Sequence, residues 1–297
     1  MPEIAEVKLL IDGFANVLSQ LNNIKINGDN GQKFINAGRF QGYHKIRPDV
    51  SYRITNHGAR GKLAFLALKI IDSDSDSNPN EDEVDYYLTF HFGMSGNFRY
   101  SPPDDADKKH YLVQFIGQMS SGVQAELWYH DIRRFGRMAF LEPAEFKEKL
   151  NKLAPDLLSD AKIENSEIVK RFRKYNKWNI CKLMMNQEKA FSGIGNYMSS
   201  EILYRVRISP FRTIDDLNDE QLIKVYEEGR KLASLAYDSG GASLYTYTGF
   251  KGDRSDFKDS LEVYNRTSDP IGRVVTRIPA EESPDKRTKF VCWDIQI

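Results

Sequence analysis

PEIAEVKLLIDGFANVLSQL, the stretch at residues 2–21, places apolar side chains at three- and four-residue spacing. Such spacing is typical of an amphipathic helix that packs one face against a larger body. The apolar positions are Ile4, Val7, Leu10, Ile11, Phe14, Val17, Leu18 and Leu21. We therefore expect a helix over residues 3–21, beginning almost at the first residue of the chain.

From about residue 24 to 141 the pattern changes to short β-rich runs separated by clusters of Gly, Asn, Asp and Pro. Several short strands with turn signals between them favour a β-sandwich or barrel. The clearest expected strands cover residues 62–71, 86–92, 110–116, 123–129 and 137–141.

Pro143 and Pro155 mark a second change, to helical patterns. Helices are expected near residues 144–152, 165–174, 179–186, 196–206 and 219–238, and two later β runs, 273–278 and 288–294, are expected to form a terminal hairpin. The predicted fold class is therefore α+β and multidomain. Its expected units are an N-terminal domain at 1–142, a linker at 143–160, a helical domain at 161–240, and a loop with the hairpin at 241–297.

The formal net charge of zero conceals an uneven distribution. Residues 72–85 carry seven acids and no base, so the rest of the chain has 42 basic residues against 35 acidic ones. A run of Ser, Asn and acids is typical of a solvated loop. The basic excess elsewhere is compatible with a nucleic-acid partner, although an ordinary soluble surface would explain it equally well.

The N-terminal residues contain two acids and no basic region, and no segment approaches eighteen consecutive apolar residues. These features argue against a secretory signal and a membrane span, so we expect an intracellular protein that is not secreted. Cys181 and Cys292 are the only cysteines. Two distant cysteines exclude both a disulfide framework and a zinc site built from four cysteines. No metal or cofactor is expected.

The second residue offers unusual chemistry if Met1 is removed, because Pro2 would then carry a free secondary amine. An α-amino group has a pKa of about 7.7–8.0, against about 10.4 for lysine, so roughly a tenth of it is unprotonated near neutrality. A neutral amine can attack a sugar C1′ carbon and form an iminium. Glu3 could move the proton, and Glu6 lies one turn further on. Taken alone, these residues are explained better by helix capping and dipole effects.

Motifs elsewhere in the chain favour the catalytic interpretation of Pro2, Glu3 and Glu6 over helix capping alone. Ordered motifs run along nearly the whole chain. They are Pro2-Glu3-x-x-Glu6-Val7, His91–Gly96 (HFGMSG), His130–Gly136 (HDIRRFG), Gly193–Tyr197 (GIGNY) followed by Ser200–Leu203 and Ile208–Pro210, and the pairs Gly240-Gly241 and Val263-Tyr264. Each resembles a motif of the formamidopyrimidine-DNA glycosylase and endonuclease VIII (Fpg/Nei) family. The joint occurrence is far more specific than any single motif.

The resemblance implies a fold and a partner. The fold would be an N-terminal β-sandwich with the N-terminal helix, a helical domain containing a helix-two-turns-helix element, and a finger hairpin, with DNA in the cleft between the domains. The family finger usually carries four cysteines, but only Cys292 lies in that region. This chain therefore resembles the Nei-like branch with a zincless finger. The implied partner is double-stranded DNA containing oxidised bases or abasic sites, bound by a monomer.

The resemblance also implies roles for individual residues. Pro2, Glu3, Glu6 and Lys62 would form the catalytic group, with Lys62 holding a phosphate next to the lesion. Met94, Arg133 and Phe135 would fill the gap left when the damaged nucleotide is extruded. Asn196, together with the free backbone N–H groups of residues 193–196 before a helix, would contact a phosphate. Arg287 would contact phosphates flanking the lesion, with Arg277 as the alternative if the hairpin register differs. Taken singly, these positions also fit core packing, a helix cap and a solvated turn.

The implied reaction is base removal through a Pro2 Schiff base, followed by β- and δ-elimination. Oxidised pyrimidines, hydantoins and formamidopyrimidines are the expected substrates, with 8-oxoguanine less expected and the loop at 242–260 influencing the choice. Two other classes compete with this interpretation. A non-catalytic damaged-DNA-binding protein would not need Pro2 beside two glutamates. A metal-dependent nuclease would need clustered carboxylates, and the densest acidic run, 72–85, is of low complexity without a nearby histidine.

Overall fold

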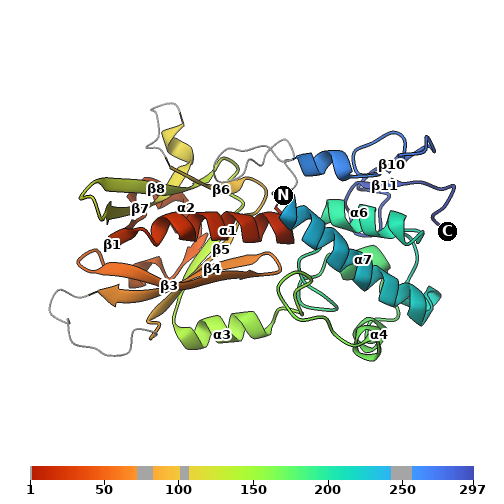
Figure 1. The fold of residues 1–297 in the computed structure, drawn as a ribbon, viewed down its shortest axis with the longest axis horizontal. Coiled ribbons are helices and arrows are strands. Elements are labelled where there is room, and N and C mark those ends of the chain that lie inside the picture. The colour runs from red at the N-terminus through yellow and green to blue at the C-terminus, as the bar shows by residue number, and fades with distance from the viewer. Residues whose placement is uncertain (1, 72–82, 101–106, 242–255) are drawn as a thin grey trace.

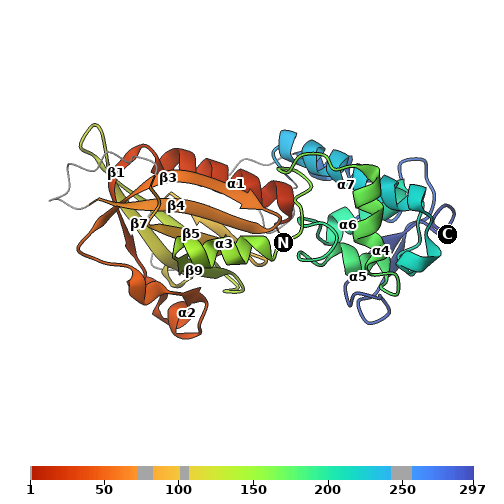
Figure 2. The same ribbon diagram turned by 90° about the horizontal axis from the view of Figure 1, so that it is seen from below.

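The computed structural model describes residues 2–71, 83–100, 107–241 and 256–297. Most of the acidic run and most of the loop at 242–260 lie outside the described residues. The molecule is elongated, with a β-rich half and a helical half side by side along its long axis (Figure 2). No helix among the described residues is long and apolar enough to cross a membrane.

The expected helices are confirmed with small changes at their ends. They are α1 (Ile4–Leu18), α3 (Pro143–Asn151), α4 (Asn165–Arg173), α5 (Ile180–Met184), α6 (Asn196–Arg205) and α7 (Asp219–Asp238). A further short helix, α2 (Gln32–Asn36), was not predicted. The first helix ends at Leu18, not at Leu21 as its apolar spacing predicted. Asn23 adopts a left-handed conformation, with φ of 53°, and Leu21 opens the first strand with its side chain buried.

The β-rich half is one continuous nine-stranded sheet with strand order β2-β9-β5-β4-β3-β1-β7-β8-β6. The strands are β1 (Leu21–Asn27), β2 (Phe40–Gln41), β3 (Ser51–Arg60), β4 (Leu63–Ile71), β5 (Tyr86–His91), β6 (Gly96–Arg99), β7 (Tyr111–Met119), β8 (Gln124–Asp131) and β9 (Arg137–Leu141). Because β1 pairs with β3 on one side and β7 on the other, it joins two layers. Figure 1 shows these layers above and below α1, so the expected sandwich takes this form.

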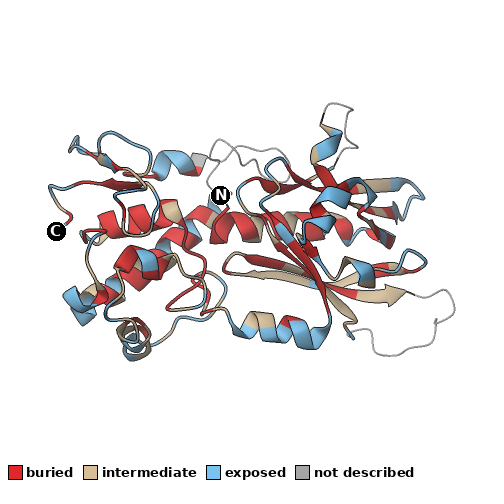
Figure 3. Cartoon of the chain, turned by 180° about the vertical axis from the view of Figure 1, so that it is seen from behind, coloured by how far each residue is buried: buried red, intermediate tan, exposed pale blue. Residues whose placement is uncertain are grey.

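Helix α1 belongs to two hydrophobic cores. Ile4 and Ala5, in its first turn, pack in the core of the helical half, whereas Val7 and the later apolar positions pack in the core between the sheet layers. One face of the helix is buried from its first residue to its last (Figure 3). Residues at the very start of the chain are therefore held between the two halves of the molecule.

The remaining elements connect the halves and complete the finger. Helix α3 lies within the predicted linker and packs Phe146 against Phe65 and Tyr87 of the sheet. The terminal hairpin consists of β10 (Thr276–Ile278) and β11 (Lys289–Val291), paired antiparallel. Its strands are shorter than the two apolar runs predicted. The buried Asp269 carboxylate organises the preceding turn, because it accepts hydrogen bonds from Tyr204 and from the backbone and guanidinium of Arg273.

Candidate active site

Glu3 sits at the junction of the two halves and caps a helix of the other half. Its buried carboxylate accepts hydrogen bonds from the backbone N–H groups of Gly195 at 2.6 Å, Tyr197 at 3.0 Å and Met198 at 3.4 Å. N–H groups at the start of a helix have no carbonyl partner within the helix, and the helix dipole favours a negative charge there. The N-terminal segment is thus fixed on α6, with Pro2 buried beside it.

The glycines before α6 allow this close approach. A Cβ on Gly195 would lie 2.2 Å from Cδ of Glu3, and one on Gly193 would lie 2.4 Å from a carbon of Ile4. The sequence suggested that the free N–H groups of this segment bind a phosphate. That interpretation is corrected here, since the donors of Gly195 and Tyr197 already serve the Glu3 carboxylate.

Glu6 faces the same junction from the next turn of α1. It accepts a hydrogen bond from the Tyr197 hydroxyl at 3.1 Å and another from the backbone N–H of Glu3 at 2.8 Å. Both glutamates are only 2% exposed. Tyr197 was part of a motif in the sequence, but nothing in the pattern indicated that its hydroxyl would bind Glu6.

Burial sets the protonation of this group. It raises the pKa of Glu3 from 4.5 to about 7; the Lys62 charge opposes this shift, and the Glu6 carboxylate adds to it. Burial also lowers the pKa of Lys62, with Glu3 acting in the opposite direction and Arg287 in the same one. Near neutrality Glu3 is therefore divided between its acid and its carboxylate form, so it can both give and take a proton.

Lys62 lies in the turn between β3 and β4. The preceding residue, Gly61, has φ of 56° and donates its backbone N–H to the buried carboxylate of Asp156. Asp156 also accepts from the backbone N–H groups of Leu158 and Ser159. The segment joining the two halves thus positions Lys62. Nothing in the sequence pattern indicated that Asp156 would bind the backbone beside Lys62.

Asp131 organises the segment that carries Arg133 and Phe135. Its carboxylate accepts from the Ser95 hydroxyl at 2.5 Å, from the backbone N–H of Arg133 at 3.2 Å and from that of Gly136 at 2.8 Å. Because Ser95 follows Met94, one buried carboxylate fixes both motif segments together. Neither Asp131 nor Ser95 was assigned a role from the sequence.

The side chains predicted to fill the gap in DNA are exposed, as expected. Met94 is 39% exposed and Phe135 48% exposed, and the Arg133 guanidinium lies 4.8 Å from the centre of the Phe135 ring. Large apolar side chains on turns do not contribute to the core, so their exposure favours a contact surface over the packing alternative. Their contact with DNA remains a prediction.

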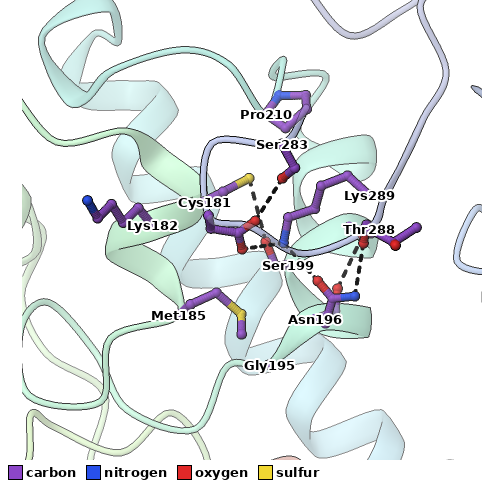
Figure 4. Close-up of polar contacts among 12 residues, drawn as sticks. Cys181, Lys182, Met185, Gly195, Asn196, Ser199, Pro210, Ser283, Thr288 and Lys289 are labelled. Carbon is purple, nitrogen blue, oxygen red and sulfur yellow. Dashed lines mark hydrogen bonds and ion pairs between the residues drawn. The ribbon is translucent and has the colours of Figure 1, made fainter. Parts of the chain in front are cut away.

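Asn196 connects α6 to the finger. Its amide donates to the Thr288 carbonyl at 3.0 Å and accepts from the Lys289 ammonium at 2.9 Å, as Figure 4 shows. Lys289 is paired at 2.7 Å with Asp285, and the two side chains are 1% and 3% exposed. Ser283 donates to the other oxygen of Asp285. This buried ion pair was not anticipated from the sequence.

Arg287 lies between Asp285 and Lys289 in the turn that precedes β11, and its side chain is exposed. It is close enough to the catalytic group to lower the pKa of Lys62. Arg277 lies on β10 opposite Phe290. The interaction with Lys62 favours Arg287 over Arg277 as the finger arginine, and its contact with phosphate remains a prediction. In the part of the chain that the structure describes, no group of three or more His, Cys, Asp or Glu side chains is arranged to hold a metal ion.

Comparison with known proteins agrees with this geometry. The family model described as the formamidopyrimidine-DNA glycosylase N-terminal domain matches residues 1–138. A formamidopyrimidine-DNA glycosylase of Corynebacterium glutamicum (strain R) is 30% identical over 240 residues, which cover 80% of this chain and 79% of the relative.

Solved structures show the same fold. The MutM (Fpg) protein of Thermus thermophilus superposes with a TM-score of 0.77 at 23% identity, covering 99% of this chain and 98% of that one. Wild-type Lactococcus lactis Fpg in complex with DNA containing an oxidised pyrimidine gives a TM-score of 0.76 at 18% identity, covering 99% of each chain. With its N-terminal residues held on α6 and its motif segments brought together as described, the chain belongs to the formamidopyrimidine-DNA glycosylase family.

Proposed function

We propose that this protein is a bifunctional DNA glycosylase and AP lyase that removes oxidised bases through a Schiff base on Pro2. The observation that carries the proposal is the position of Pro2 and Glu3 between the two halves, with Glu3 bound to the start of α6 and its pKa raised to about 7. A carboxyl group that titrates near neutrality suits proton transfer.

The proposed reaction begins with the free amine of Pro2. Its lone pair attacks the sugar C1′ carbon, the bond from C1′ to the damaged base breaks, and the base leaves with the bonding electrons. Protonated Glu3 delivers its proton to the sugar ring oxygen, the ring opens, and the proton that the amine loses as the iminium forms passes to the departing base. β-Elimination then expels the 3′ phosphate and δ-elimination the 5′ phosphate, leaving a one-nucleoside gap.

The other residues would hold DNA in place for this chemistry. Lys62 and Arg287, whose charges interact across the junction, suit the phosphates next to the extruded nucleotide. Met94 and Phe135 would occupy the space left in the duplex, with Arg133 directed at the orphaned base. Asn196 would act through the finger, because its amide holds Thr288 and Lys289.

The proposed substrates are oxidised pyrimidines, hydantoins and formamidopyrimidines in double-stranded DNA, and abasic sites, acted on by a monomer. The names of the relatives support formamidopyrimidines, and the Lactococcus lactis complex supports an oxidised pyrimidine. We place 8-oxoguanine lower among the substrates.

Borohydride trapping tests the proposal. The protein, its N-terminus confirmed by mass, is incubated with a duplex carrying thymine glycol, beside a Pro2→Thr variant, an 8-oxoguanine duplex, and Pro48→Thr as a matched control in an exposed loop. We expect a covalent complex with the wild type and Pro48→Thr, mapping to Pro2, and none with Pro2→Thr. DNA binding without any trapped complex would favour the non-catalytic damaged-DNA-binding alternative.

A further inference from the structure

A second group of cations lies outside the catalytic residues. A hollow of about 570 Å³ opens where the sheet edge meets α3, and its lining includes Arg39, His91, Arg137 and Lys149. No aspartate or glutamate lines it. The three cations, Arg39, Arg137 and Lys149, come from separate parts of the chain, so the tertiary structure alone brings them together.

The sheet defines the geometry of this pocket. His91 at the end of β5 and Arg137 at the start of β9 are paired across the antiparallel ladder, so their side chains lie on one face. Arg39 directly precedes β2, and its carbonyl accepts a hydrogen bond from the Met138 backbone at 2.8 Å. Lys149 approaches from the last turn of α3.

The positive charge in the pocket is not neutralised within the described parts of the chain. Arg39, Arg137 and Lys149 form none of the ion pairs found among the described residues. The acids of α3 are engaged elsewhere, with Glu145 bound to Lys45 and Glu148 to Lys152.

The cations also affect one another. Burial lowers the pKa of Lys149, and Arg137 lowers it further. Burial, followed by Lys149 and Arg137, lowers the pKa of His91 to about 4, while a hydrogen bond with the Lys62 backbone opposes the shift. Like charges gathered in this way are unfavourable unless an anion neutralises them.

We propose that the pocket of Arg39, Arg137 and Lys149 binds a backbone phosphate of the DNA strand beyond the lesion. We choose a DNA phosphate as the ligand because the pocket is continuous with the surface proposed to contact DNA. His91 begins the segment that presents Met94, and Arg137 directly follows the segment that presents Phe135, so the pocket adjoins the proposed contact surface. The inference rests on the proposed function, since it assumes damaged DNA as the ligand.

Salt-dependent binding tests the pocket without needing catalysis. The probe is a duplex with a tetrahydrofuran abasic analogue, and the variant is Arg137→Gln/Lys149→Gln. The matched control is Lys147→Gln/Lys152→Gln, which removes two exposed charges of α3 and its end that do not line the pocket. Losing one phosphate contact lowers the slope of log K against log salt by about 0.9. Between 50 and 200 mM salt the affinity deficit of the pocket variant should therefore shrink about 3.5-fold, while the control keeps the wild-type slope.

Two further measurements use duplexes of different length and inorganic phosphate as a free anion. Shortening the duplex from the end that runs over the pocket should remove the difference between wild type and pocket variant, whereas shortening it from the other end should leave the difference in place. Equal slopes for the two proteins, or a deficit that persists at every duplex length, would overturn the inference. So would loss of inorganic phosphate binding by the pocket variant with unchanged DNA affinity, because the pocket would then serve a free anion.

The two proposals fail separately. Single-turnover cleavage at saturating enzyme should be the same for the pocket variant and the wild type, because the pocket lies outside the catalytic group. If the wild type binds DNA with the expected salt slope and forms no trapped complex, the glycosylase proposal fails and the phosphate pocket stands.

Discussion

Replacing Lys289 with methionine should loosen the finger without unfolding the molecule. The change leaves the Asp285 carboxylate buried and without its partner at 2.7 Å, and it also removes the donor to Asn196. Breaking a buried ion pair by removing one member costs about 3–5 kcal/mol. Because the pair lies within a terminal hairpin, we expect the loss of stability to appear as local opening of the hairpin and not as unfolding of the whole molecule.

Amide hydrogen exchange over residues 285–292 measures that opening. A cost of 3–5 kcal/mol corresponds to exchange faster by about 10²–10⁴-fold, at a tenfold change for every 1.4 kcal/mol. The matched control is Lys286→Met, which removes an exposed lysine of the same turn and should change the exchange little.

A double variant separates loss of charge pairing from loss of packing. In Asp285→Leu/Lys289→Met no charge remains buried, and replacing a buried pair by apolar side chains is often close to neutral. Most of the protection should therefore return. The reasoning is refuted if Lys289→Met exchanges like Lys286→Met, or if the double variant is no better protected than Lys289→Met.

Three further predictions concern the junction and the contact surface. Glu3 has a folded pKa raised to about 7, so the native state binds more protons than the unfolded state between about pH 4.5 and 7, and its contribution to stability is lost as the pH rises through that range. The free energy of unfolding of Glu3→Gln and of the wild type is measured by denaturation at pH 5 and at pH 8. Between these pH values the wild type should lose about 2–3 kcal/mol of stability relative to the variant. If the difference between the two proteins is the same at both pH values, the shifted pKa is contradicted. Gly195→Ala places a Cβ against Glu3 and should cost about 1–3 kcal/mol in urea unfolding and abolish borohydride trapping; wild-type trapping would show that the junction can relax. Asp131→Ala leaves its donors unpaired and should cost about 1–3 kcal/mol and weaken binding to lesion duplexes, whereas unchanged affinity would separate this segment from DNA recognition.

Local patterns in the sequence were sufficient for much of the fold. The amphipathic spacing after Pro2 produces α1, and the helices near 165–174 and 219–238 agree with α4 and α7 almost residue for residue. These elements depend on interactions within a few residues, and their periodicity is written directly in the chain. The end of α1 was misplaced because Leu21 continues the apolar spacing but is buried from a strand instead.

Ordered motifs were sufficient to indicate the family and the candidate residues. Pro2, Glu3 and Glu6 do meet at one junction, and Met94 and Phe135 are exposed, as the resemblance implied. The prediction that the backbone N–H groups at the start of α6 bind a phosphate was wrong for Gly195 and Tyr197. Those groups lie within hydrogen-bonding distance of Glu3, about 190 positions earlier in the chain, and no local pattern reveals such a contact.

The sequence by itself therefore determined most of the longer elements, their order and which residues carry reactive groups. Only the tertiary structure decided the environment of those groups: the burial that raises the pKa of Glu3, the Asp285–Lys289 pair beside Asn196, and the pocket of Arg39, Arg137 and Lys149. The physical reason is range. Helix and strand periodicity arise from neighbours along the chain, whereas desolvation and charge interactions depend on every group within several ångströms in space, whichever part of the chain supplies it.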